Sequence, residues 1–83
     1  MGQDLLALIG KMTPQFSKGQ RLIANYMINH FDKAAFMTAS KLGSTVGVSE
    51  STVVRFASEV GFAGYPELQR ALQELIRNKL TTV

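Results

Sequence analysis

The fold is decided by residues 38–61, which read TASKLGSTVGVSESTVVRFASEVG. Near the middle of this stretch, Gly47 can adopt the left-handed backbone conformation that ends a helix sharply. Ser49 follows two residues later, and its side chain can accept a backbone N–H group as the cap of a second helix. The stretch therefore predicts two short helices, over residues 39–46 and 50–60, joined by a tight turn.

Apolar residues in the same stretch repeat as expected for two helices that pack together. Leu42 and Val46 share one face of the first predicted helix, and Gly43 stands where the second helix has to pass closely. Val48 fills the corner between the two helices. On the second helix, four residues at spacings i, i+3, i+4 and i+7 form one predicted buried stripe: Val53, Phe56, Ala57 and Val60. The pattern indicates a helix-turn-helix; the alternative is an ordinary helical hairpin in which Gly47 is only a cap.

The opposite face of the second predicted helix carries short polar side chains around one arginine. Such a face fits the major groove of DNA, where an arginine can donate two hydrogen bonds to guanine O6 and N7. Arg55 has two alternatives, a solvated surface position or a contact with Glu59 or Ser51 on its own helix. Val54 could touch a thymine methyl group or complete the edge of the core. The residues predicted to read bases are Ser49, Ser51, Thr52 and Arg55.

The first helix of such a unit crosses the DNA backbone, so its hydroxyls and its lysine are candidates for phosphate contacts. For Thr38, capping of the helix at 39–46 is favoured over a phosphate contact. The other basic residues, Lys18 among them, are scattered and are interpreted mostly as solubility charges. The predicted phosphate-contacting set, extended by one serine of the second helix, is Thr38, Ser40, Lys41, Thr45 and Ser58.

Helical periodicity and capping signals extend over the rest of the chain and predict an all-α fold. Ser17 followed by Gln20 is a capping box, and Pro66 opens the last helix at the position where its missing N–H is harmless. Leu22 is expected to face the core, and residues 32–37 are expected to be a connection with room for one helical turn. We predict one compact five-helix domain over residues 1–83, with helices at about 4–12, 18–30, 39–46, 50–60 and 66–80.

Composition and charge exclude several other classes of protein. None of the 83 residues is cysteine, so the chain has neither disulfides nor thiolate zinc sites. No apolar run approaches the roughly 20 residues of a membrane span. His30 is the only histidine and has no clustered carboxylates near it in sequence, so neither a metal site nor a catalytic acid–base pair is indicated. The net charge of +3 suits a polyanionic partner. We expect a cytoplasmic, non-enzymatic protein with no cofactor and no membrane contact.

Two short patterns go beyond the general requirements of a helix-turn-helix. They are S-x-S-T-V-V-R-F at residues 49–56 and G-F-x-G-Y at residues 61–65, and a helix follows them after Pro66. With these patterns the chain resembles, over essentially its whole length, the N-terminal domain of RpiR-type bacterial transcriptional regulators. It departs from the family at Gly43, where alanine is usual, and at Ala63, where lysine is frequent. The resemblance supports Ser49, Ser51, Thr52 and Arg55 as the DNA-facing set.

The resemblance implies an all-helical domain that binds double-stranded operator DNA as a homodimer and regulates sugar-phosphate or amino-sugar metabolism. It also implies a larger C-terminal domain of the sugar-isomerase type that binds a phosphosugar effector. Because the sequence stops at Val83, we expect the chain to be one domain of a longer regulator, without an effector site of its own. The alternative hypothesis is a helical protein-interaction or dimerisation module without direct DNA contact, which the 46% content of hydrophobic residues supports.

Overall fold

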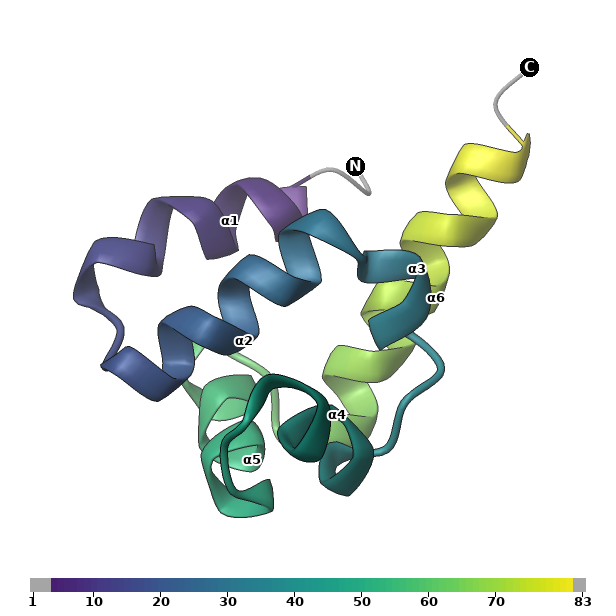
Figure 1. The fold of residues 1–83 in the computed structure, drawn as a ribbon. Coiled ribbons are helices and arrows are strands. Elements are labelled where there is room, and N and C mark those ends of the chain that lie inside the picture. Colours follow the sequence, from purple (N-terminus) through teal and green to yellow (C-terminus); the bar gives the residue numbers. More distant parts are fainter. Residues whose placement is uncertain (1–3, 82–83) are drawn as a thin grey trace.

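The computed structural model describes residues 4–81, which form a helical domain (Figure 1). The helices α1 and α2 lie side by side, α4 and α5 lie below α2 in the view of Figure 1, and α6 runs along the other side of the molecule, against α3 and α5. In chain order the elements are α1 (Asp4–Met12), the 3-10 helix η1 (Thr13–Gln15), α2 (Lys18–Asn29), α3 (Phe31–Ala34), α4 (Ala39–Val46), α5 (Glu50–Glu59) and α6 (Tyr65–Thr81).

The hydrophobic core lies where these helices meet, and five of them contribute fully buried large side chains. Burial of one such side chain contributes about 1.5–3 kcal/mol, so each helix is held in place by its own apolar face. The predicted stripe of α5 is confirmed, because its four residues are at most 5% exposed. The largest fully buried side chains are Phe56, Ile9, Ile23, Met27, Leu42, Leu68, Leu72 and Val53.

The prediction that Leu22 of α2 faces the core is wrong. Leu22 is 42% exposed, whereas its neighbours Ile23 and Ala24 and the following Met27 are fully buried. An α-helix turns about 100° per residue, so the narrow stripe that contains these three residues leaves Leu22 on the opposite face. The packing of α2 therefore uses a narrower face than its apolar composition indicates.

Several predicted helix ends move by one residue. The helix α2 ends at Asn29 instead of residue 30, because His30 leaves the helical region at φ −139° and ψ 45° while its N–H still donates to the Tyr26 carbonyl at 2.7 Å. The helix α5 ends at Glu59, and the predicted residue 60 becomes its cap. The last helix begins at Tyr65 and reaches Thr81, so Pro66 is its second residue instead of its first.

The predicted total of five helices misses two short elements. The helix α3 is a single turn that begins one residue before the segment at 32–37, which was expected to be a connection with room for one helical turn. Its Ala34 is fully buried together with Ala35. A four-residue helix is too short to show the 3.6-residue period, so hydrophobic patterning does not reveal it. The helix α1 ends before Pro14 as predicted, but the chain continues directly into η1. The all-α class with a helix-turn-helix is confirmed. No helix within residues 4–81 is both long and apolar enough to cross a bilayer.

Candidate nucleic-acid interface

A three-residue turn joins α4 to α5 and fixes the angle between them. Gly47 has φ +87°, in the left-handed region that L-residues with side chains rarely adopt. The N–H groups of Gly47 and Val48 both donate to the Gly43 carbonyl, each at 2.8 Å. A Cβ atom on Gly43 would lie 2.7 Å from the Val48 carbonyl oxygen, closer than real Cβ contacts. The predicted close approach at Gly43 and the predicted turn at Gly47 are therefore both confirmed.

A cluster of three hydroxyl groups begins the second helix of the unit. The Ser49 side chain accepts the Thr52 N–H at 3.2 Å, which confirms it as the predicted cap. The same Oγ lies 3.1 Å from the Ser51 Oγ and 2.9 Å from the Thr52 Oγ1. A serine hydroxyl has one donor and two acceptor sites, so these contacts occupy most of its capacity. Of the predicted base-reading hydroxyls, Ser51 keeps the most freedom to bind another group.

The outward face of α5 is polar and centred on an arginine. Arg55 is exposed and, within the part of the chain that the structure describes, its guanidinium makes no hydrogen bond or ion pair. The expected alternative partner Glu59 is therefore not bound to it. Ser51 and Ser58 lie on the same outward face at helical spacing and are exposed. Val54, beside them, is 41% exposed, so it lies outside the core.

Some of the residues predicted to contact phosphate at α4 are already engaged in hydrogen bonds, and others are not. Thr38 accepts the Lys41 N–H at 3.1 Å, so it caps α4 as favoured. Thr45 donates to the Lys41 carbonyl at 2.8 Å and is likewise engaged within its own helix. Ser40 and the Lys41 ammonium are exposed and have no partner among the described side chains of residues 5–77. Both groups therefore remain available to an anion, as does the exposed Ser44 hydroxyl on the same helix.

Three side chains of α6 fix the segment that leads into α4. Tyr65 donates its hydroxyl to the Met37 carbonyl at 2.6 Å, and the Gln69 side-chain amide donates to the same oxygen at 3.1 Å. One turn further on, the Gln73 amide donates to the Ala35 carbonyl at 3.0 Å. Burial raises the pKa of Tyr65 from 10.0 to about 12. Sequence patterning did not reveal this clamp, because its bonds join residues that are far apart in the chain.

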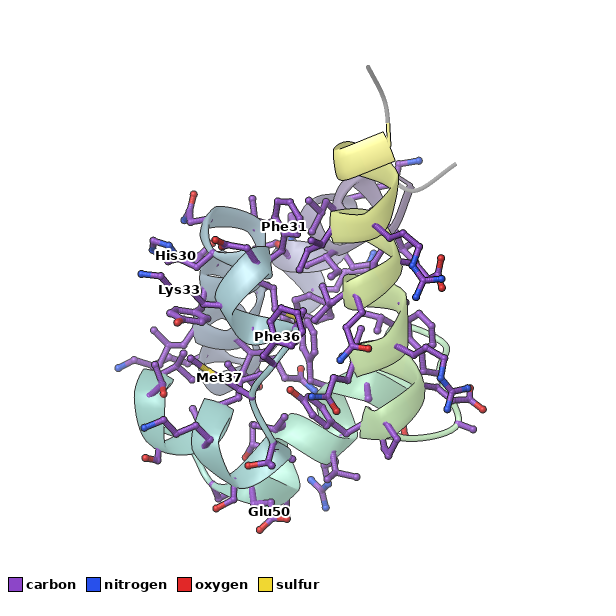
Figure 2. The ribbon with its side chains drawn as sticks, turned by 90° about the vertical axis from the view of Figure 1, so that its right-hand side faces the viewer. His30, Phe31, Lys33, Phe36, Met37 and Glu50 are labelled. Carbon is purple, nitrogen blue, oxygen red and sulfur yellow. The ribbon has the colours of Figure 1, made fainter. Side chains whose placement is uncertain are left out.

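These hydrogen bonds from α6, here called the clamp, fix the backbone directly before α4. Met37 directly precedes the Thr38 cap, so its anchored carbonyl holds the first turn of α4 and its exposed Lys41 in place. Figure 2 shows Met37 in the segment between α3 and α4, with Glu50 at the beginning of α5 at the lower end of the molecule. Among the described residues, no three histidine, aspartate or glutamate side chains gather as a metal ion would require.

Two capped helices joined by a left-handed glycine turn, with a polar face around an exposed arginine, define a DNA-binding helix-turn-helix domain. The model of the RpiR-family helix-turn-helix domain matches residues 3–79. The chain therefore belongs to the RpiR family of transcriptional regulators.

Similar proteins are named as regulators of the same kind. The chain is 32% identical over 63 residues to the uncharacterized helix-turn-helix-type transcriptional regulator YfhH of Escherichia coli K12. These aligned residues make up 76% of this chain and 22% of YfhH. It is 31% identical over 72 residues to the helix-turn-helix-type transcriptional regulator HexR of Pseudomonas aeruginosa. This alignment covers 87% of this chain and 25% of HexR. The matched part thus spans about a quarter of the length of these relatives.

Proposed function

We propose that this domain binds double-stranded DNA sequence-specifically, with α5 in the major groove and α4 across the phosphate backbone. The observation that carries the proposal is Arg55, which is exposed and unpaired among the described residues on a helix fixed by its cap and its buried stripe. Arg55 reads a base, Ser51 assists it, and Ser49 with Thr52 orients the first turn. Lys41 and Ser40 contact phosphates, whereas Thr38 and Thr45 contribute mainly by ordering α4. Ser58 lies on the outward face of α5 and contacts a phosphate of the DNA backbone beside the groove.

The test is a titration of labelled random-sequence duplex with the domain by fluorescence anisotropy, at about 50 and 200 mM salt. Wild-type protein is expected to bind at low salt and to lose affinity steeply as salt rises. The double variant Arg55→Ala/Lys41→Ala is expected to bind far more weakly, with circular dichroism as the check of its fold. A folded wild-type domain that does not bind DNA at low salt would contradict the proposal.

At the level of the whole protein, we propose a bacterial regulator of sugar-phosphate or amino-sugar metabolism whose phosphosugar effector binds a separate C-terminal domain. This part rests on the family resemblance and on the greater length of the relatives. Selection of bound sequences from a random pool, followed by a search for matching sites beside sugar-catabolic genes, tests it. Bacterial DNA lies in the cytoplasm, and the proposal places the protein there. Sites beside unrelated genes only would contradict the metabolic assignment.

We also propose that two copies occupy one operator, since dimeric helix-turn-helix proteins read paired half-sites. Exposed apolar surface favours contact between proteins, and Phe36 is 70% exposed on the face that Figure 2 turns to the viewer. Sedimentation of the domain with a selected operator is expected to show two copies per duplex. One copy per duplex at saturation would contradict the proposal for this domain.

A further inference from the structure

The beginning of α2 and the residue Phe16 just before it are held against α5 and the turn in front of it by two separate contacts. The Phe16 ring, 3% exposed, packs on the Phe56 ring of α5 with a centroid distance of 5.1 Å. Three residues later, the Cβ position of Gly19 lies 3.4 Å from the Thr52 Cγ2 and 3.4 Å from the Val48 Cγ1. Figure 1 shows the beginning of α2 beside α5. The backbone of residues 16–19 therefore has a defined place beside the proposed DNA-reading helix.

Lys18 lies between these two contacts and carries the positive charge of the segment. Its side chain is exposed and has no partner among the side chains of residues 5–77 that the structure describes. The backbone on either side is fixed, because the Ser17 hydroxyl accepts the Gln20 N–H at 3.3 Å and the Gln20 side chain accepts the Ser17 N–H at 3.0 Å. The lysine thus extends from an ordered turn instead of a loose loop.

The first turn of α5 has no carboxylate on the edge that Gly19, the neighbour of Lys18, approaches. Gly19 approaches α5 at Thr52, and Glu50, the acidic residue of that first turn, is two residues earlier. Two residues correspond to about 200° around a helix, so Glu50 lies on the other edge of α5. The other acidic residue of α5, Glu59, lies at its far end. A cation at Lys18 therefore flanks the Thr52 edge of the recognition helix.

We propose that Lys18 is a further DNA-contacting residue, which binds a backbone phosphate flanking the groove that α5 enters. The major groove is about 12 Å wide, so a helix that lies in it has phosphates along both of its edges. A lysine on a flexible four-carbon stem suits such a contact, because phosphate binding needs a point charge rather than a fixed fork. Lys18 acts from α2 and adds to Lys41, which acts from α4. The inference rests on the proposed DNA binding by α5.

The first test is the salt dependence of duplex binding by Lys18→Ala, Lys18→Gln and Lys18→Arg. One lost phosphate contact lowers the slope of log affinity against log salt by about 0.9, which corresponds to roughly a threefold smaller loss of affinity between 50 and 200 mM. Lys18→Ala and Lys18→Gln are expected to show this change on every duplex sequence, and Lys18→Arg is expected to keep the wild-type slope. Arg77→Ala removes the same charge from the far half of α6 and is expected to leave the slope unchanged.

The second test uses the absence of cysteine from the chain, which allows a single label. A photo-crosslinker on Lys18→Cys is expected to attach to duplex DNA, and the same label on Arg77→Cys is expected to remain unattached. Unchanged slopes for Lys18→Ala and Lys18→Gln and no crosslink, while wild type binds and Arg55→Ala/Lys41→Ala does not, would overturn the role of Lys18 alone. Absence of binding by folded wild type would overturn this inference together with the proposed function.

Discussion

Among single residues, Arg55 has the surroundings that base recognition requires. Its guanidinium is exposed, and no carboxylate among the side chains of residues 5–77 holds it. Arg55→Ala is expected to cost about 1–3 kcal/mol on a selected operator and less on random duplex, because a bidentate contact with guanine discriminates while a phosphate contact does not. Competition titrations with the two duplexes measure the difference. Equal losses on both duplexes would show that Arg55 contacts phosphate.

The residue scale also shows which site features follow from sequence. Caps depend on one side chain and the backbone a few residues away, so the roles of Thr38 and Ser49 as caps follow from residue type and spacing. The competition between capping and base contact does not. Base reading by Ser49 and Thr52 stays a prediction, and the sequence does not show that their hydroxyls bind each other at 2.9 Å. Rotamers and neighbours decide that outcome, and a one-dimensional pattern contains neither.

At the scale of elements, two glycines in helices are expected to respond oppositely to the same substitution. A Cβ on Gly10 of α1 has only the flexible end of Ile28 nearby, at 3.9 Å, so Gly10→Ala is expected to stabilise the fold by about 0.5–1 kcal/mol. At Gly43 a Cβ meets the Val48 backbone oxygen at 2.7 Å, and a backbone atom cannot rotate away. Overpacking costs about 1–3 kcal/mol, so Gly43→Ala is expected to be destabilising despite its gain in helix propensity.

Urea unfolding of both variants beside wild type measures these changes, with an unchanged slope as the sign that only stability has moved. Stabilisation by both substitutions would show that the turn at 47–49 can shift away from α4.

How well the sequence predicts each helix depends on the same local interactions. The bounds of α4 and α5 depend on local caps and a full hydrophobic period, whereas α3 is one turn that packing stabilises through Ala34 and Ala35.

At the scale of the whole molecule, α6 connects the C-terminal part of the chain to the segment in front of α4. The Gln69 and Gln73 amides reach the Met37 and Ala35 carbonyls across 32 and 38 residues of sequence. Such long-range hydrogen bonds depend on the assembled fold. The periodicity of apolar residues therefore predicts helix α6 but not the carbonyl groups that its side chains bind. Their consequence is that the orientation of the helix-turn-helix depends on residues outside the motif, and the Tyr65 hydroxyl is the most buried of these contacts.

Tyr65 is expected to make the stability of the domain fall in alkaline solution. Burial raises its pKa from 10.0 to about 12, so the folded protein keeps the phenolic proton between pH 10 and pH 12 while the unfolded chain releases it. The unfolded state then binds fewer protons, and the free energy of unfolding decreases as pH rises through this window, on the order of 2–3 kcal/mol in total. The stabilisation by neutral Tyr65 is fully present below pH 10.

The variant Tyr65→Phe tests this expectation. It loses the 2.6 Å hydrogen bond to the Met37 carbonyl, which costs about 1 kcal/mol of stability near neutral pH, but its stability is expected to decline less steeply in alkaline solution. Urea unfolding of both proteins from neutral to alkaline pH measures the two declines. Equal declines would mean that the Tyr65 hydroxyl ionises as readily in the folded domain as in the unfolded chain, and that the clamp on Met37 does not depend on its proton.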